Sequence, residues 1–166
     1  RSHCGLMHAS KVGQAAPFFI EVLAKGAEET SMMDQDAVDS FGCSSCWPAD
    51  ASAAWENRRR LSREPALVDE SHFRVSLSSC RSCGQFFIAI FAEQVDWTDG
   101  DDPQYWSVLP LTRAEVTALT AGGEALTESA LASLGPRRRC LRRDWPKGDG
   151  EPKLYWGEGL AIVPHD

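Results

Sequence analysis

Four of the six cysteines in this 166-residue chain form two Cys-x-x-Cys pairs, and no other sequence feature restricts the fold as strongly. The pairs are Cys43 with Cys46 and Cys80 with Cys83, and Gly84 follows the second pair directly. Two intervening residues let both thiolates of a pair face one tetrahedral ion, and two such turns complete a Cys4 shell. Gly84 permits the positive φ with which the chain turns back. We expect these four cysteines to bind structural Zn²⁺, with iron as the alternative metal.

Other interpretations of the cysteines lead to different chemistry. A redox dithiol would precede a helix, whereas the residues after Cys83 read as a strand, which argues against it. Inert buried thiols are the third interpretation. Cys4 and Cys140 are unpaired, and we interpret them as small buried hydrophobic residues rather than catalytic thiols.

Residues 43–91 resemble a zinc ribbon, in which two cysteine knuckles on β-hairpins share one ion. The two pairs and Gly84 carry the resemblance. The 33 residues between Cys46 and Cys80 depart from it, because compact Cys4 modules have about 15 to 20 residues there. The resemblance implies a structural metal and a role in recognising nucleic acid or protein, without catalysis.

Two apolar stretches beside the second cysteine pair predict a central antiparallel hairpin. Residues 73–78 alternate between apolar and polar, which is typical of a half-buried strand. Residues 85–92 are apolar on both faces, which indicates a strand covered on both sides. The fold class predicted is α+β, with an antiparallel sheet, a Cys4 zinc-ribbon-like site, and helices packed after the central hairpin.

The remaining elements are predicted from periodicity and end signals. They are a helix over 51–63 closed by Pro65, a strand over 106–109, a helix starting at Thr112 with Glu115 in a capping box, a helix over 124–134, a hairpin of 140–142 with 153–156, and a short strand over 159–163. We expect one domain over 1–166, with a zinc-ribbon-like core over about 40–110 and a part with helices and a β-hairpin over about 111–166.

The charge of the chain bears on its partners. Seventeen Lys and Arg against twenty-four Asp and Glu give a net charge of −7, which disfavours a general polyanion binder. Two arginine islands stand out: Arg58, Arg59 and Arg60 in the first, with Arg63 nearby, and Arg137, Arg138 and Arg139 in the second, with Arg142 and Arg143 nearby. We interpret them as solvated faces. A nucleic-acid-binding patch is the alternative, and it requires both islands on one face of the fold.

An acidic loop over residues 96–103 has an unusual composition. Its candidate partner-binding residues are Asp96, Trp97, Asp99, Asp101 and Asp102. One interpretation is a docking loop for a basic protein partner, with Trp97 as the anchor. The alternative is a solvated turn between two strands.

No catalytic arrangement is recognisable in the sequence. The four histidines have no metal-ligand spacing, and no phosphate loop, nucleophile elbow or dinucleotide fingerprint occurs. The leading hypothesis is therefore a zinc-binding, non-catalytic protein-interaction module acting as an adaptor, regulator or inhibitor. A nucleic-acid-binding regulator is the first alternative. The second is an enzyme of unidentified class, whose site would lie away from the zinc and involve carboxylates or His72. Without a recognisable targeting or membrane segment, the cytoplasm is the expected compartment.

Overall fold

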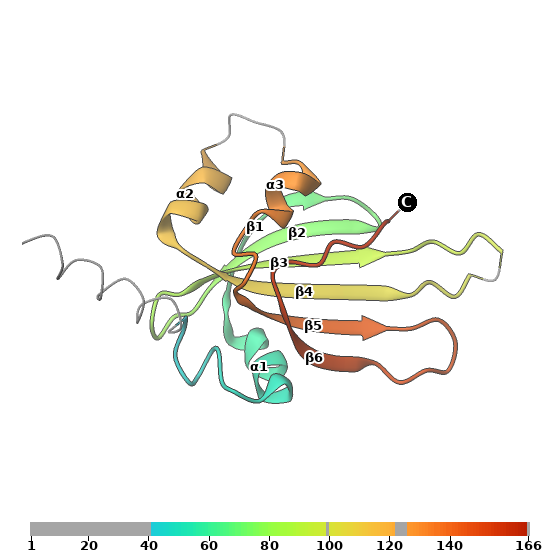
Figure 1. The fold of residues 1–166 in the computed structure, drawn as a ribbon, viewed down its shortest axis with the longest axis horizontal. Helices are drawn as coiled ribbons and strands as arrows, with labels where there is room; N and C mark the ends of the chain where they lie inside the picture. The colour runs from blue at the N-terminus through green and yellow to red at the C-terminus, as the bar shows by residue number, and fades with distance from the viewer. Residues whose placement is uncertain (1–40, 99, 122–125, 166) are drawn as a thin grey trace, which may run out of the picture. The chain divides into compact units, whose positions relative to one another are not determined.

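A six-stranded antiparallel sheet is the main element of the computed structural model, which describes residues 41–98, 100–121 and 126–165 (Figure 1). The strands follow one another in the sheet in chain order: β1 (Ser62–Asp69), β2 (Phe73–Ser79), β3 (Phe86–Glu93), β4 (Gln104–Leu111), β5 (Arg139–Trp145) and β6 (Lys153–Glu158). The helical elements are short: α1 (Ala51–Asn57), the 3₁₀ turn η1 (Arg58–Arg60), α2 (Arg113–Thr120) and α3 (Glu128–Ala132). The α+β prediction is confirmed. Whether the whole chain is one domain stays a prediction, because residues 1–40 lie outside the described part.

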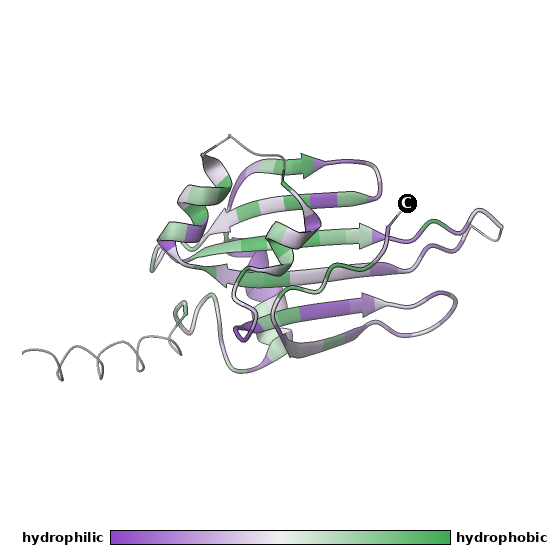
Figure 2. Ribbon diagram, turned by 45° about the horizontal axis from the view of Figure 1, so that its top comes forward, coloured by the Kyte–Doolittle hydropathy of each residue, from purple (hydrophilic) through white to green (hydrophobic). Residues whose placement is uncertain are grey.

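The predicted antiparallel hairpin is present as β2 and β3, and β3 is one of the two central strands of the sheet together with β4. Its register runs from Phe73 opposite Ala92 to Ser79 opposite Phe86. Ile88 and Phe87 are adjacent in β3, point to opposite faces, and are both fully buried. Both faces of β3 are therefore covered, and hydrophobic residues concentrate in the central strands (Figure 2).

The sheet has a hydrophobic core on each face. The first core consists of Phe73, Val75, Leu77, Ile88, Ile90, Ala92, Leu109, Leu111, Leu131, Cys140 and Leu160. The second core consists of Cys46, Trp47, Ala54, Trp55, Cys80, Phe87, Val108 and Leu141. Helices α2 and α3 pack on the first core, and α1 belongs to the second. The predicted capping box of Thr112 and Glu115 is present at the start of α2.

The helix predicted over 51–63 is wrong at its C-terminal end. The α-helix ends at Asn57 and the 3₁₀ turn η1 ends at Arg60. The chain then forms β1, which contains Pro65. A proline is tolerated there because β1 is an edge strand, paired only with β2. The register of this pairing also shifts between Arg63 and Ala66, on either side of the proline.

Two predictions near the C-terminus also need correction. The helix predicted over 124–134 is confined to α3, because Thr127 caps it at Ala130 N; residues 124 and 125 lie outside the described part. The segment 159–163 is not a strand. Gly159 has a φ of +62° and turns the chain away from β6. The segment then crosses the first core, where Ser107 Oγ donates a 2.9 Å hydrogen bond to Ala161 O.

No helix within the described ranges has both the length and the apolar character needed to cross a bilayer.

Candidate metal centre

The four paired cysteines come together from two turns that are distant in the sequence. One turn, residues 43–46, precedes α1, and the other, residues 80–83, connects β2 to β3. The Sγ–Sγ distances are 3.7 Å for Cys43–Cys46, 4.0 Å for Cys43–Cys80 and 3.7 Å for Cys46–Cys83. All four Sγ atoms lie within 4.8 Å of one another.

These distances match a common tetrahedral centre. A Zn–S bond of about 2.3 Å implies about 3.8 Å between two sulfurs of a tetrahedron. A disulfide requires about 2.05 Å, and the four thiols are free. The cluster can therefore hold a metal ion.

Backbone hydrogen bonds fix the shape of both turns. In the first, Cys46 N and Trp47 N both donate to Cys43 O, at 3.0 and 2.8 Å. In the second, Gly84 N donates to Cys80 O at 2.8 Å. Gly84 has a φ of +75°, as its place after the cysteine pair predicts. Each turn thereby directs both of its sulfurs to the same side.

Burial and backbone hydrogen-bond donors shift the pKa values of the four thiols in different directions. The backbone N–H of Ser45 lowers the pKa of Cys43 to about 7. Burial raises the pKa of Cys46 strongly and also raises that of Cys83. At Cys80 burial raises the pKa, but hydrogen bonds from the Cys83 and Ser82 backbone outweigh it and the net shift is downward. Four adjacent thiolates would repel one another, so full ionisation requires a cation between them.

Two residues beside the cysteines were not identified from the sequence. Gly42 has a φ of +75°, and a Cβ there would lie 2.9 Å from Cys46 Sγ. The side chain of Gln85 accepts a hydrogen bond from Gly42 N at 3.2 Å and donates to Leu111 O at 2.7 Å. Gln85 thus connects the two turns to β4. Only the position of these residues next to the cysteine pairs could have indicated them.

The acidic loop contacts the turn between β5 and β6. Asp96 pairs with Lys147, Asp101 accepts a hydrogen bond from Gly148 N, and Asp102 accepts one from Asp96 N at 2.6 Å. Trp97 is 85% exposed. Asp99 lies outside the described residues. A partner-binding role for this loop stays a prediction.

The six arginines of the two islands differ in their surroundings. Arg58 stacks on the Trp55 ring at 3.7 Å, Arg138 pairs with Glu115 at 2.9 Å, and Arg139 stacks on the Trp156 ring at 4.1 Å. The other three, Arg59, Arg60 and Arg137, are exposed. Arg58 and Arg139 lie beside the second core, whereas Arg138 contacts α2 beside the first. A nucleic-acid interface stays a prediction.

The remaining candidate residues have other neighbours. Cys140 is fully buried, as predicted, and burial raises the pKa of its thiol. Cys4 lies outside the described residues. His72 Nδ1 lies 3.0 Å from Glu93 Oε2, and Gln104 Nε2 donates to Glu93 Oε1 at 2.7 Å.

Comparison of the chain with protein-family models, with curated proteins and with solved structures gives no match. The resemblance to a zinc ribbon thus depends on the two cysteine pairs and Gly84.

Proposed function

We propose that this protein is a zinc-stabilised, non-catalytic protein-interaction module. The observation that carries the proposal is the convergence of four Sγ atoms within 4.8 Å of one another. Thiolate sulfurs at tetrahedral spacing are typical ligands of structural Zn²⁺.

Four sulfurs fill the coordination shell of a tetrahedral ion, so no position is left for water or a substrate. The ion would instead join the turn before α1 to the β2–β3 turn. Trp47 extends this junction into the second core, because its ring lies 5.1 Å from that of Phe87 and 4.9 Å from that of Trp156. The metal therefore stabilises one end of the sheet.

The interaction surface would lie around the acidic loop and the β5–β6 turn, which extend from the same end of the sheet (Figure 1). Trp97 is 85% exposed and Trp145 is 43% exposed. Exposed tryptophans are typical anchors of protein interfaces. The neighbouring carboxylates favour a partner with a basic surface.

The metal is tested by elemental analysis of the purified chain. We expect one zinc per chain, loss of zinc in Cys83→Ser, and full zinc content in the control Cys140→Ala, whose thiol lies outside the cluster. Wild-type protein that is folded as purified, contains no metal and takes up no added zinc would contradict the proposal. So would equal zinc content in Cys83→Ser and the wild type.

The interaction surface is tested separately, with a photo-crosslinking amino acid placed at position 97 in one protein and at the exposed Thr117 of α2 in another. We expect a defined cross-linked protein partner from position 97 only. If position 97 gives no product, or the same products as position 117, the surface is wrong, whatever the zinc analysis shows.

A further inference from the structure

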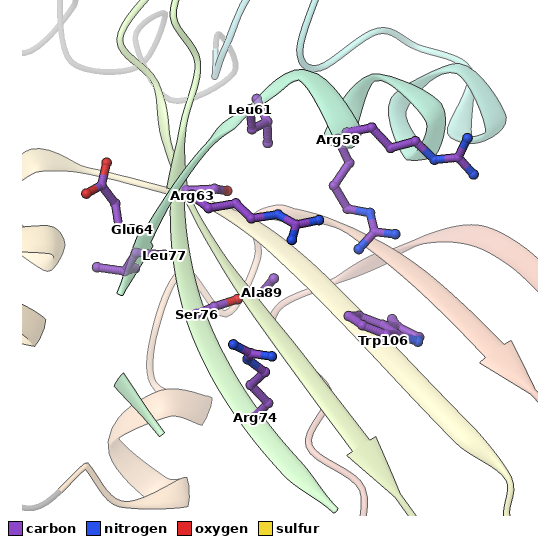
Figure 3. Close-up of a pocket in the computed structure, with 11 residues that line it drawn as sticks. Arg58, Leu61, Arg63, Glu64, Arg74, Ser76, Leu77, Ala89 and Trp106 are labelled. Atoms are coloured by element: carbon purple, nitrogen blue, oxygen red, sulfur yellow. The ribbon is translucent and has the colours of Figure 1, made fainter. Parts of the chain in front are cut away.

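A cavity of about 200 Å³ opens on the face of the sheet that carries the second core (Figure 3). Its lining comes from η1 and from strands β1 to β4. We call it the arginine cavity, because its lining includes Arg58, Arg59, Arg63 and Arg74.

Three of these guanidinium groups approach the same space from different elements. Figure 3 shows Arg58 reaching in from η1, Arg63 from β1 and Arg74 from β2. Glu64 is the one carboxylate in the lining, and it points away from them in this view. The alternation of side chains along β1 explains this difference, because adjacent residues of a strand face opposite sides of the sheet.

The positive charge of the cavity is only partly balanced within the protein. Among the described residues, Arg58 and Arg63 form no ion pair, and Arg59 pairs with Glu56 on the surface at 3.0 Å. Arg74 Nε lies 3.5 Å from Asp69 Oδ1, in a pair that is more than half exposed. An anion placed between these arginines would find several donors that no carboxylate occupies.

Two tryptophan rings fix the position of the Arg58 side chain in the arginine cavity. Its guanidinium lies 3.7 Å from the centre of the Trp55 ring and 5.1 Å from that of Trp106. Its Nε is buried and has no hydrogen-bond partner in the described part of the chain. Burial lowers the pKa of Arg58, and the positive charges of Arg143 and Arg63 lower it further. A bound anion would compensate both for the burial of the charged guanidinium and for its repulsion by the neighbouring arginines.

We infer that the arginine cavity binds a single phosphate monoester group. Guanidinium groups form paired hydrogen bonds with phosphate oxygens, and the Ser76 hydroxyl lies among the three arginines as a further polar group (Figure 3). The volume is below the roughly 300–1,000 Å³ of pockets that enclose a whole drug-sized ligand, so the cavity fits one anionic group. The net charge of −7 argues against a long polyanion. This inference goes beyond the proposed function and does not depend on the metal.

The test uses the full chain as purified and follows tryptophan fluorescence and heat of binding. The probes are inorganic phosphate, a capped phosphoserine peptide, the same peptide without phosphate, and a short single-stranded oligonucleotide. The variant is Arg63→Gln, because Arg63 is exposed and its replacement should leave the fold intact. The control is Arg137→Gln, which removes the same charge from an exposed position outside the cavity lining.

We expect saturable binding of phosphate and of the phosphopeptide, and none of the unphosphorylated peptide. Arg63→Gln should raise the Kd about tenfold or more, the effect of losing a charged hydrogen bond, while Arg137→Gln leaves it unchanged. If the phosphopeptide binds more tightly than phosphate does, we assign the phosphate group to a protein ligand. If the two probes bind with equal affinity, we assign it to a small molecule. Absence of phosphate binding, equal effects of the two variants, or tighter binding of the oligonucleotide would overturn the inference.

Discussion

Arg138 Nη1 donates a 2.9 Å hydrogen bond to Glu115 Oε2, which joins the residue before β5 to the first turn of α2. The same carboxylate oxygen accepts a hydrogen bond from Thr112 N at 2.7 Å and so completes the capping box. Arg138 Nη1 also donates to Pro110 O at 2.7 Å. One carboxylate therefore caps α2 and holds the strand that follows α3.

The first prediction concerns Glu115→Gln. We expect it to lower the free energy of unfolding by about 1–3 kcal/mol, because it removes the charge from two hydrogen bonds in a largely buried pair. Chemical denaturation measures the change. The control Glu128→Gln alters an exposed first-turn glutamate of α3, and equal losses in the two variants would contradict the role of Glu115.

The pH dependence of this contribution follows from the pKa of Glu115. Burial raises that pKa, but hydrogen bonds from Arg138 and Thr112 outweigh burial, and the net pKa is lowered. A lowered folded-state pKa means that the stabilisation is complete above the unfolded-state value of about 4.3 and is lost as pH falls through the folded-state pKa. Denaturation curves in this acidic range should converge for the wild type and Glu115→Gln. A constant difference at all pH values would contradict this.

The second prediction compares two glycines with the same backbone conformation. Gly42 and Gly84 both have a φ of +75°, so alanine at either position should cost about 1–2 kcal/mol. A Cβ at Gly84 has no neighbour within 4 Å, whereas one at Gly42 would lie 2.8 Å from Trp47 Cβ and 2.9 Å from Cys46 Sγ. Gly42→Ala should therefore lower the melting temperature more than Gly84→Ala does and also weaken zinc binding, measured by competition with a chelator. Equal effects of the two substitutions on melting temperature and zinc binding would contradict a role for the close contacts at Gly42.

The third prediction concerns removal of the metal from the protein. Since metal binding is coupled to folding, a chelator should lower the melting temperature. Hydrogen exchange should show lost protection first in the two cysteine turns, residues 41–47 and 80–85, while the centre of β4 remains protected. Zinc added back should restore protection, whereas magnesium should not. A uniform change over the whole sheet would contradict a local structural metal.

The fourth prediction concerns thiol reactivity in the chelated, folded protein. Cys43 has a lowered pKa of about 7 and should react quickly with an alkylating reagent. Cys83 is exposed, but its raised pKa keeps it protonated, so it should react more slowly than Cys43. Cys140 is fully buried with a raised pKa and should react only on unfolding. Mass spectrometry of the labelled peptides distinguishes the sites. Rapid labelling of Cys140 in folded protein would show that the first core opens.

Sequence patterns predicted the features that depend on local spacing. The β2–β3 hairpin was predictable because its apolar residues alternate on one strand and occupy both faces of the other. The cysteine cluster was predictable because two residues between cysteines define the local turn, and two turns share one shell. The capping box was also predictable from local spacing, because Thr112 and Glu115 are three positions apart.

Features that depend on distant contacts were not predictable in this way. Strand β1 was missed because Arg63, Glu64 and Pro65 are poor strand formers, and only pairing with β2 stabilises them. The arginine islands were interpreted as solvated, yet Arg139 Nη2 donates to Trp47 O across 92 positions of sequence. No local pattern records such a contact. The hydrogen bonds of Gln85 with Gly42 and Leu111 also join residues that are distant in the sequence, so they too were not predictable.

The order of the sheet has a consequence for how the protein is made. Each strand pairs only with its neighbours along the chain, so the sheet can extend by one strand at a time during synthesis. All four ligand thiols have been synthesised once Cys83 is added, before β3 to β6 exist. A cation captured at that stage would hold the nascent β2 beside the turn that precedes α1, and later strands would add to an edge that is already anchored.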